Sequence, residues 1–434
     1  MSILGEPAHS QRQPNIVLIH CHDLGDWLST YGYRGVPDSR LQDFAEHSLV
    51  FDSAFATAPL CTPARSSLFT GQMPHQNGLM GLTHQGWRYA EGVRTLPEML
   101  SPLGYHTTLI GLQHEDFDAR VLGFDEVLGL GFIPRALEVA RLVQRWYAHN
   151  QNGSPYFATI GMWEVHRPWP PEDYRPADPA SVDVPPYLPD NGHTRADIAG
   201  FYGAIRQMDE AFELILSAID ASPDASNTIV IFTTDHGAAF PRAKSTLYDS
   251  GVKVTLLIRP PLQWGVPPAR VKTLASHLDI APTLVELAGG SVREELAGRS
   301  LAPLLLGATR DLNETRELFF EKTYHDRYDP MRAIRTNDAK YIRNYVNGPL
   351  LPLPADLENS ETRAGMGNGH LGPRPREELY LLGDDPWELS NLAQSEHHAE
   401  LKAGLSEDLD RFMEESSDPL LEGDVDEPPE PYRR

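Results

Sequence analysis

Apolar residues along this chain fall into two alternating patterns. Short apolar runs, typical of buried strands, occupy residues 15–22, 108–112, 156–163, 228–233 and 253–258. Segments with apolar positions at helical spacing lie between them, at 39–46, 63–70, 95–103, 134–148, 195–220 and 274–288. This alternation predicts an α/β fold, with a large, mainly parallel sheet sandwiched by helices. In such a sheet the ligand lies beyond the carboxyl ends of the strands, so those ends are where we expect the chemistry.

The pattern changes after about residue 312. Runs at 332–335 and 340–345 predict a hairpin, 378–382 a further strand and 396–415 a helix. These elements indicate a smaller antiparallel α+β domain, which we place at 326–420 after a main domain at 1–325. Segments 168–190 and 365–375 are rich in proline or glycine, so we expect loops there, the first of them wrapping the surface or rimming a pocket. The acidic, proline-rich end at 421–434 is predicted to be disordered.

The charge balance limits the partners of this protein. It has 37 basic and 61 acidic residues among 434, for a net charge of -24. Such an acidic surface disfavours nucleic acids and anionic membranes, and an anionic substrate would need a local basic pocket. Two cysteines make no disulfide framework, and the sequence shows neither a signal peptide nor an apolar run of membrane-spanning length. We therefore expect a cytoplasmic protein with no nucleic-acid or membrane partner, and leave open whether it forms a homo-oligomer.

Two strand ends carry a carboxylate beside an imidazole. His22-Asp23-Leu24-Gly25 ends the first apolar run, and Thr234-Asp235-His236-Gly237 follows the run at 228–233. Either motif alone is more often a turn, because aspartate and glycine are common turn residues. The ends of parallel strands can converge, however, and two aspartates with one or two histidines form a reasonable divalent metal site. The matched pair leaves a metal site and a pair of turns as equal alternatives.

One of the two cysteines lies at a predicted helix start, in the stretch CTPARSSLFTG at 61–71. Pro63 suits the first position of a helix, where an N–H would have no helical partner. Cys61 would then lie at the helix N-terminus, where free amides, the helix dipole and the nearby Arg65 favour an anion or a nucleophile. The spacing leaves open a plainer alternative, a small buried cysteine with Arg65 on the surface. Cys21, inside an apolar run, is expected to be buried and without a role.

Together these motifs resemble those of type I sulfatases. Cys61-Thr62-Pro63-Ala64-Arg65 is similar to the Cys-x-Pro-x-Arg signature of that family, and SSLFTG to its continuation. Further motifs occur in the same order as in the family, from residue 14 to about 395. They are the two strand ends and the stretches LASHLDIAPTLVELAG and ELYLLGDDPWELSNLA. HQNGLMGLTHQ, FPRAKSTLY and YDPMRAIR look most like the sulfamidase branch, the N-sulfoglucosamine sulfohydrolases. The resemblance implies an alkaline-phosphatase-like fold whose main domain is catalytic.

The resemblance also implies an activity, the hydrolysis of a sulfate ester or N-sulfate of a small sulfated sugar with release of inorganic sulfate. In the family, a formylglycine-generating enzyme oxidises the signature cysteine to Cα-formylglycine, and this enzyme would be a transient partner. The aldehyde is hydrated to a gem-diol on a divalent metal. One hydroxyl attacks sulfur, and the other then expels sulfate and restores the aldehyde. In this chain the modified residue would be Cys61.

By position, Asp23, Asp235 and His236 match metal ligands of the family, and residue 61 completes the site. His22 stands where most of the family has another aspartate, so it is a ligand or lies beside one. Calcium is the first expectation on family grounds. Two imidazoles would suit manganese or zinc better, because calcium prefers oxygen ligands.

Four residues match catalytic positions of the family. Arg65 matches the residue that holds the formylglycine hydroxyl, and His114 an active-site histidine. His166 matches the histidine near the leaving group, a candidate general acid, and Lys244 a sulfate-binding cation. Leu112 stands where the family usually has a lysine, which weakens the expected anion site.

Candidates for sugar recognition are four further basic residues. Arg167 lies beside the candidate general acid, and His325, Arg327 and Arg332 lie at the predicted seam between the domains. Charges at such a seam are also commonly interdomain ion pairs.

Two rival functions stay open. A phosphonate monoester or phosphodiester hydrolase of the same superfamily shares the fold and the formylglycine, and Asp-His-Gly is common among such enzymes. A non-catalytic anion- or sugar-binding relative would explain the unusual Leu112 and His22, although the intact signature argues against it.

Overall fold

A computed structural model describes residues 12–131, 133–149, 153–312 and 315–428. An eight-stranded sheet runs through its larger part, in the order β10-β2-β9-β7-β1-β6-β4-β5. β9 runs antiparallel to both neighbours, and the other pairs are parallel, as the sequence predicted. The strands are β1 (Asn15–Cys21), β2 (Leu49–Phe51), β4 (His106–Gly111), β5 (Glu126–Leu128), β6 (Tyr156–Gly161), β7 (Thr228–Thr234), β9 (Leu256–Arg259) and β10 (Ala269–Val271).

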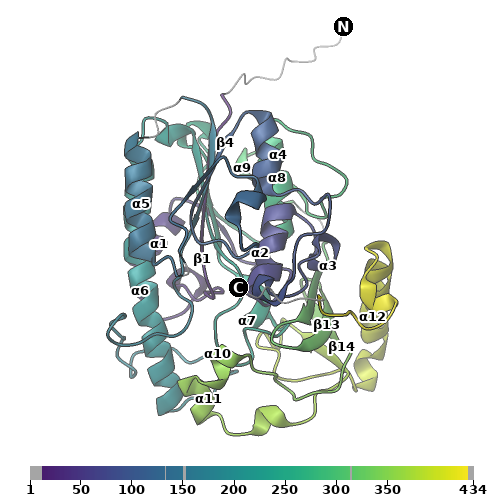
Figure 1. The fold of residues 1–434 in the computed structure, drawn as a ribbon. Helices are drawn as coiled ribbons and strands as arrows, with labels where there is room; N and C mark the ends of the chain where they lie inside the picture. Colours follow the sequence, from purple (N-terminus) through teal and green to yellow (C-terminus); the bar gives the residue numbers. More distant parts are fainter. Residues whose placement is uncertain (1–11, 132, 150–152, 313–314, 429–434) are drawn as a thin grey trace.

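Helices cover both faces of this sheet (Figure 1). One face carries α1 (Ser39–Ala45), α5 (Ala136–His149) and α6 (Gly192–Asp220). The opposite face carries α2 (Cys61–Thr70), α4 (Leu96–Leu100), α8 (Ile280–Leu287) and α9 (Ala302–Leu305). The short helices α3 (Pro74–Asn77) and α7 (Asp249–Val252) and a small sheet of β3 (Ala54–Phe55), β8 (Lys253–Val254) and β11 (Ala275–Ser276) complete this part.

The central strand β1 divides its side chains between two cores. Val17 and Ile19 belong to the core that contains α5 and α6, whereas Ile16 and Leu18 belong to the core that contains α2 and α8. Successive side chains of a strand point to opposite faces of the sheet. This alternation places the next even-numbered residue, His20, on the α2 side, where it contacts that helix.

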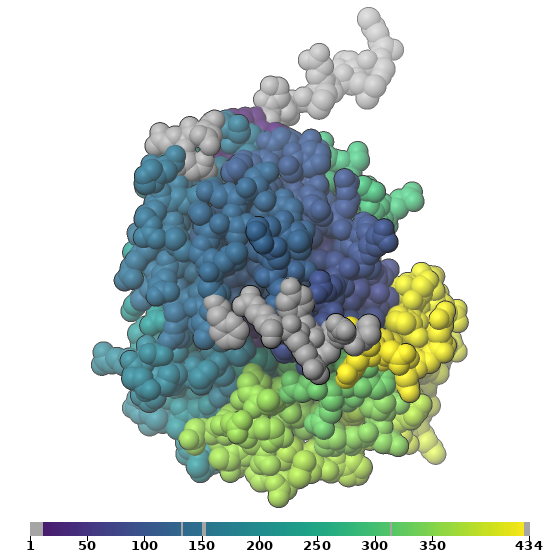
Figure 2. Space-filling view, viewed as in Figure 1, coloured from purple at the N-terminus to yellow at the C-terminus, as the bar shows by residue number. Residues whose placement is uncertain are grey.

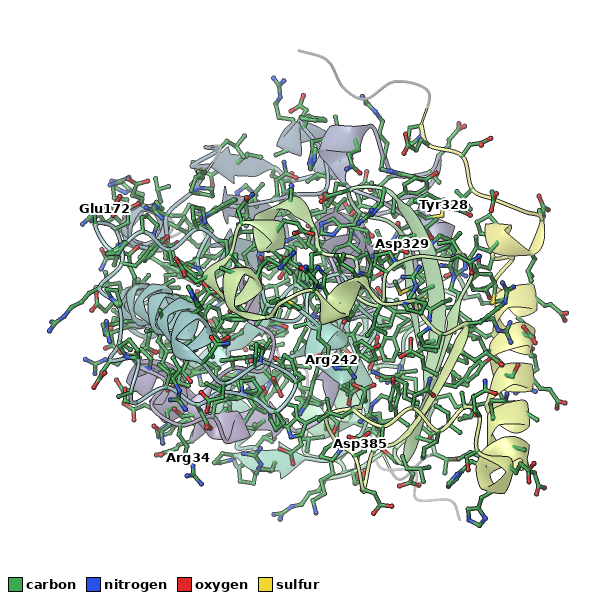
Figure 3. The ribbon with its side chains drawn as sticks, turned by 90° about the horizontal axis from the view of Figure 1, so that it is seen from below. Arg34, Glu172, Arg242, Tyr328, Asp329 and Asp385 are labelled. Atoms are coloured by element: carbon green, nitrogen blue, oxygen red, sulfur yellow. The ribbon has the colours of Figure 1, made fainter. Side chains whose placement is uncertain are left out.

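A second unit contains a four-stranded antiparallel sheet of β12 (Leu318–Tyr324), β13 (Tyr328–Arg335), β14 (Ala339–Asn344) and β15 (Glu377–Leu381). The long helix α12 (Ala399–Glu415) packs on this sheet, and the short helices α10 (Ala355–Glu358) and α11 (Glu361–Gly365) lie between β14 and β15 in the sequence. Seen from below, Tyr328 and Asp329 lie close together in this unit (Figure 3). In the space-filling view the unit, green to yellow, lies directly against the larger part (Figure 2). The predicted α+β character of the C-terminal part is confirmed.

The predicted boundary between residues 325 and 326 is corrected by β12. This strand pairs with β13, so the second sheet begins at Leu318, inside the range assigned to the main domain. The sequence LFFEKTY does not show the pattern of a buried strand, because two charged residues interrupt its apolar run. Glu321 and Lys322 are nonetheless buried, since Glu321 pairs with His75 and Lys322 with Asp329. Local pattern could not reveal the partner of Glu321, which lies 246 positions away.

Other predicted elements are confirmed with shifted ends. The run at 253–258 is two strands, β8 and β9, because Thr255 between them directs its N–H and hydroxyl to the Gly25 carbonyl. The helix predicted at 274–288 begins at Ile280, after β11. Segment 168–190 contains neither helix nor strand, as expected. Among the described helices, none combines the length and apolar character that crossing a bilayer requires.

The C-terminal end is held by two tyrosines as far as it is described. Tyr324 donates its hydroxyl to the Val425 carbonyl at 2.6 Å, and the Val425 N–H lies 3.2 Å from the Tyr328 hydroxyl. Tyr328 also donates to Asp424 at 3.1 Å. The prediction of disorder from residue 421 is therefore wrong for this stretch, because tertiary hydrogen bonds fix its backbone. The rest of that prediction concerns residues 429–434, and the expected lack of a signal peptide concerns residues 1–11. Both stretches lie outside the described residues.

Arg332 was predicted to recognise substrate, and the structure places it in the interior instead. Its side chain donates to Asp418 through Nε at 2.5 Å and Nη2 at 2.9 Å. Nη1 donates to the carbonyls of Lys322 and Met331. The residue is 1% exposed, so this arginine holds the second unit together and does not meet substrate.

Replacing Arg332 with methionine should lower the free energy of unfolding by about 3 kcal/mol or more, because Asp418 would be left buried without its counterion. Denaturant unfolding followed by tryptophan fluorescence measures the change. Arg327→Met is the matched control, since Arg327 is exposed and the same substitution there should cost less than about 0.5 kcal/mol. Equal stability of the two variants would contradict the assigned ion pair.

Candidate active site

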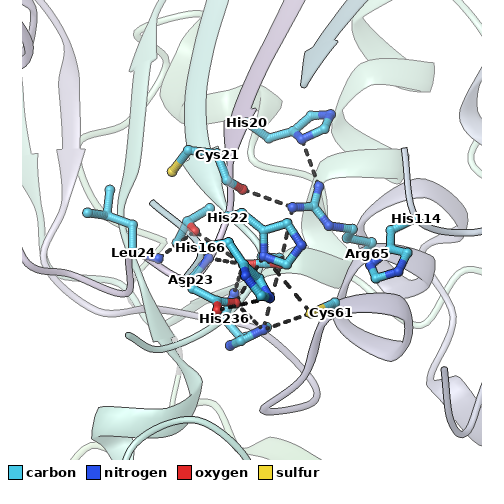
Figure 4. Close-up of polar contacts among 12 residues, drawn as sticks. His20, Cys21, His22, Asp23, Leu24, Cys61, Arg65, His114, His166 and His236 are labelled. Carbon is cyan, nitrogen blue, oxygen red and sulfur yellow. Dashed lines mark hydrogen bonds and ion pairs between the residues drawn. The ribbon is translucent and has the colours of Figure 1, made fainter. Parts of the chain in front are cut away.

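Neighbouring strands deliver polar side chains to one edge of the large sheet. β7, β1, β6 and β4 lie side by side and parallel, and Cys21 at the end of β1 lies opposite Thr234 at the end of β7. The segments just beyond these ends hold the residues that the motifs indicated, namely Asp235 and His236 after β7, His22 and Asp23 after β1, His166 after β6 and His114 after β4. They converge on Cys61 at the start of α2 (Figure 4).

Two carboxylates and two imidazoles form the centre of the site, and all four side chains are buried. His22 Nδ1 lies 2.9 Å from Asp23 Oδ1 and 3.1 Å from Asp235 Oδ2. His236 Nε2 lies 3.0 Å from Asp23 Oδ1. With Sγ of Cys61 included, one atom of each residue lies within 4.8 Å of all the others. The alternative of two independent turns is therefore wrong.

The backbone at both strand ends has conformations that aim these side chains. Asp23 has a φ of 54°, in the left-handed region that aspartate tolerates better than most residues. At Gly237 a Cβ would lie 2.0 Å from the Ser250 carbonyl oxygen, so only glycine fits beside this neighbouring segment. The motifs His-Asp-Leu-Gly and Asp-His-Gly thus fix the direction of the carboxylates as well as supplying them.

Helix α2 brings Cys61 to this cluster. The helix begins at Cys61, so Pro63 is its third residue, not the first as predicted, and still lies in the turn where N–H groups lack helical partners. Sγ of Cys61 lies 3.5 Å from His236 Nε2 and 4.0 Å from His22 Nδ1. Burial opposes ionisation of the thiol, but the charges of His22 and Lys244 lower its pKa well below the usual value. Residue 61 lies at a point where negative charge is stabilised.

Arg65, one turn further along α2, is fully buried, so the alternative that places it on the surface is wrong. Its Nη2 donates to the Cys21 carbonyl at 3.0 Å and to Asp235 Oδ2 at 3.1 Å, and its Nη1 donates to His20 Nδ1 at 2.8 Å. Because a guanidinium only donates, His20 must accept at Nδ1 and carry its proton on Nε2. That nitrogen lies 3.1 Å from the Thr159 hydroxyl. Sequence reasoning missed His20, although strand alternation places it on the side of α2.

Lys244 and His166 lie on the other side of the carboxylates. Lys244 Nζ lies 2.7 Å from Asp23 Oδ2 and 3.4 Å from His166 Nε2. His166 Nδ1 lies 2.5 Å from the Arg167 carbonyl, so the neutral ring donates there and turns the lone pair of Nε2 toward Lys244. Burial, followed by the charge of Lys244, lowers the pKa of His166 to about 4. The ring is therefore neutral near pH 7.

Three residues that no motif indicated surround this group. Asp356, from α10 in the second unit, lies 2.7 Å from Lys244 Nζ. The exposed His84 stacks parallel to His114, with ring centroids 6.4 Å apart. Trp163 packs on His166 with a centroid distance of 4.4 Å. His84 lies in the family-like stretch HQNGLMGLTHQ, and Trp163 lies three positions before His166, but Asp356 has no local sequence signal.

The central cluster suits a divalent cation. It offers two carboxylates and two imidazoles, with residue 61 as a fifth donor. The carboxylates attract positive charge strongly. Burial lowers the pKa of both imidazoles, but the charge of Asp235 outweighs it and raises the pKa of His22 to about 9 and that of His236 well above its usual value. Among the described residues, the buried His22 Nε2 finds no hydrogen-bond partner. A mixed nitrogen and oxygen donor set suits manganese or zinc better than calcium.

Arg167 was predicted to reach the substrate, and its contacts contradict this. Both terminal nitrogens donate to Asp197 at 2.7 Å, and Nε donates to the Ala239 carbonyl at 2.7 Å. The guanidinium also stacks on Trp169, 4.0 Å from the ring centroid. These contacts use three of the five guanidinium N–H groups and hold the side chain in the interior, so they give Arg167 a structural role.

His325 and Arg327 occupy different positions at the seam. His325 is buried, and its Nδ1 lies 3.0 Å from the hydroxyl of Ser245, the residue after Lys244. Arg327 is exposed on the turn between β12 and β13. Contact of either residue with substrate stays a prediction.

Comparison with known proteins agrees with this geometry. The sequence profile of the Sulfatase family matches residues 14–291, and that of the N-sulphoglucosamine sulphohydrolase C-terminal region matches residues 239–359. The chain belongs to the sulfatase family. The resemblance to sulfatases, close to the sulfamidase branch, is thereby confirmed.

Several relatives cover nearly the whole chain. Human N-sulphoglucosamine sulphohydrolase is 29% identical over 94% of this chain and 92% of its own length. A Delta 4,5-hexuronate-2-O-sulfatase of Bacteroides thetaiotaomicron is 24% identical over 99% of this chain and 95% of its own length. A protein solved in complex with its substrate D-glucosamine-2-N,6-O-disulfate has the same fold, with a TM-score of 0.73, 16% identity, and coverage of 94% of this chain and 99% of its own. This sulfatase is accordingly a hydrolase of sulfuric esters or N-sulfates.

Replacing His20 with leucine should lower kcat roughly 10- to 100-fold with little change in KM, since a buried charged donor that loses its acceptor costs about 1.5–3 kcal/mol. Sulfate release under saturating substrate measures the effect. His20→Asn is the matched control, because its amide oxygen can accept from Arg65 Nη1 and should restore most of the rate. An unchanged kcat in the leucine variant would rule out this positioning role.

Proposed function

We propose that this sulfatase hydrolyses the sulfate ester or N-sulfate of a small sulfated sugar and releases inorganic sulfate. The observation that carries the proposal is the position of residue 61. It lies at the start of α2, against a cluster of two carboxylates and two imidazoles, with Lys244 among the surrounding cations. The sugar substrates for which the human, bacterial and solved relatives are named support this choice.

The cluster and residue 61 would together provide the attacking group. When present, a formylglycine made from Cys61 would supply an oxygen nucleophile, and a divalent metal would supply the positive charge that activates it. His22, Asp23, Asp235 and His236 would hold that metal. Calcium is the expectation from family resemblance, and manganese or zinc the expectation from the donor atoms. Arg65 places a permanent positive charge beside the nucleophile, and its hydrogen bonds hold the start of α2 in position.

The remaining residues would handle the anion and the proton. Lys244 is buried and directs its ammonium group into the site, where sulfate oxygens would bind. His166 would donate a proton to the departing oxygen or nitrogen. Its ring is neutral in the free protein, so it must first gain a proton, and the negative charge of a bound sulfate group favours that gain. His114 also contacts residue 61. With the buried Leu112 in place of a lysine, one usual cation is missing from the anion site.

Protein made together with a formylglycine-generating enzyme, in the cytoplasm where we expect both, should release sulfate from N-sulfoglucosamine or from a sulfate ester of the same sugar. Its tryptic peptide 41–65 should show the mass loss of a thiol converted to an aldehyde. Cys61→Ala should lower sulfate release on the order of a thousand-fold or more, because the nucleophile is gone. Protein made without the modifying enzyme is the control. Normal turnover by unmodified protein or by Cys61→Ala would overturn the mechanism.

The same preparation separates the rival functions. Sulfate and phosphonate monoesters of one aryl leaving group should be compared, and the proposal expects the sulfate ester to be hydrolysed faster. A preference for the phosphonate would favour the phosphonate hydrolase. Tight binding of sulfated sugars without turnover, in protein whose residue 61 is fully modified, would favour the non-catalytic relative.

Replacing Asp235 with asparagine should reduce the divalent metal that stays bound after dialysis from about one per chain to a small fraction, because the variant loses an anionic ligand. Elemental analysis by mass spectrometry measures the metal directly, with no need for activity. Asp43→Asn is the matched control, since Asp43 is exposed on α1. Restoring the chelated enzyme with calcium, manganese or zinc identifies the ion. Full metal content in the Asp235 variant would contradict the assigned site.

A further inference from the structure

A carboxylate lies at the outer edge of the anion site, where its negative charge would repel an anionic group of the substrate. Asp356 Oδ2 lies 2.7 Å from Lys244 Nζ, and the same ammonium nitrogen lies 2.7 Å from Asp23 Oδ2. The side chains along this row are increasingly exposed, from 0% at Asp23 through 2% at Lys244 to 24% at Asp356. Asp356 is thus the member of the row that meets whatever enters from solvent.

The position of Asp356 is fixed by the second unit and is not that of a mobile surface side chain. The first residue of α10, Ala355, donates its N–H to Asp326 Oδ2 at 2.7 Å. Leu357, the residue after Asp356, is fully buried in the core that includes β1 and α6. With both neighbours anchored, the carboxylate is held toward Lys244.

A negative charge here opposes binding of the sulfate group itself. Lys244 is already paired with Asp23, so a second carboxylate is not needed to neutralise it. The buried part of the site, from residue 61 to Lys244, would be filled by the sulfur and its oxygens. The part of the substrate that reaches Asp356 is therefore the sugar ring bonded to the sulfated oxygen or nitrogen. A carboxylate accepts hydrogen bonds from hydroxyl or ammonium groups and repels other carboxylates.

We propose that Asp356 determines which sugar this sulfatase accepts as the leaving group: it selects sugar rings that present hydroxyl or amino groups to it and rejects rings that carry a carboxylate. The inference rests on the proposed function and narrows its substrate class to sulfated neutral or amino sugars, as opposed to sulfated uronic acids. Specificity of this kind combines attraction for one ligand with charge repulsion against another.

The test uses two ligands that differ only in one carboxylate, N-sulfoglucosamine and its counterpart with C6 oxidised to a carboxylate. Calorimetry on the full chain carrying Cys61→Ala measures both dissociation constants without turnover. We expect the neutral ring to bind at least about ten-fold more tightly than the carboxylated one, and Asp356→Asn to reduce that ratio about ten-fold. Glu358→Gln is the matched control: it removes the same charge from the same short helix, but Glu358 is exposed and pairs with Arg363, so the ratio should not change.

Each outcome decides the inference. An unchanged ratio in Asp356→Asn, or equal tightening of both ligands, would mean that Asp356 is merely a counterion of Lys244. A preference for the carboxylated ring, or no binding of either ligand, would also overturn the proposal. Failure of the proposed function would look different, as it would leave the modified wild-type protein without sulfate release whatever the binding ratio shows.

Discussion

The hydrogen bonds of the buried Arg65 are the constraint on which the site depends. They join α2 to the ends of β1 and β7, through the Cys21 carbonyl, Asp235 and His20. A guanidinium with no solvent exposure must keep its partners, because leaving such a charge unpaired typically costs about 3–5 kcal/mol. The helix therefore cannot slide along the sheet, and residue 61 at its start is held against the two imidazoles.

Further ion pairs lie outward from this point. Arg65 pairs with Asp235, while Asp23 pairs with Lys244, which in turn pairs with Asp356. Each cation contacts a carboxylate, so the whole row can be buried, yet the ammonium and guanidinium groups still favour an anion between them. The row starts on the large sheet and ends in the second unit, so the shape of the pocket depends on how the two parts are joined.

Buried ion pairs make that junction. His75 of α3 contacts Glu321 of β12, and Asp249 of α7 pairs with Arg335 of β13. Arg332 proved wrong as a substrate residue because it is buried in a pair with Asp418 inside the second unit. Buried ion pairs also hid β12 from the sequence analysis, since buried charges break the apolar pattern that signals a strand. Arg167 was wrong for a related reason, because Asp197 already occupies its charged fork.

The sequence by itself determined the alternation of strands and helices, the two aspartate-histidine motifs at strand ends, and Cys61 at a helix start. These features are local: strand and helix periods, turn residues and helix ends are set by a few neighbouring positions. Only the tertiary structure decided that His20 accepts from Arg65, that Arg167 and Arg332 face inward, and that Asp356 reaches Lys244. Those outcomes depend on contacts between residues 30 to 112 positions apart, and the side chain that neutralises a given charge follows from packing that no local pattern records.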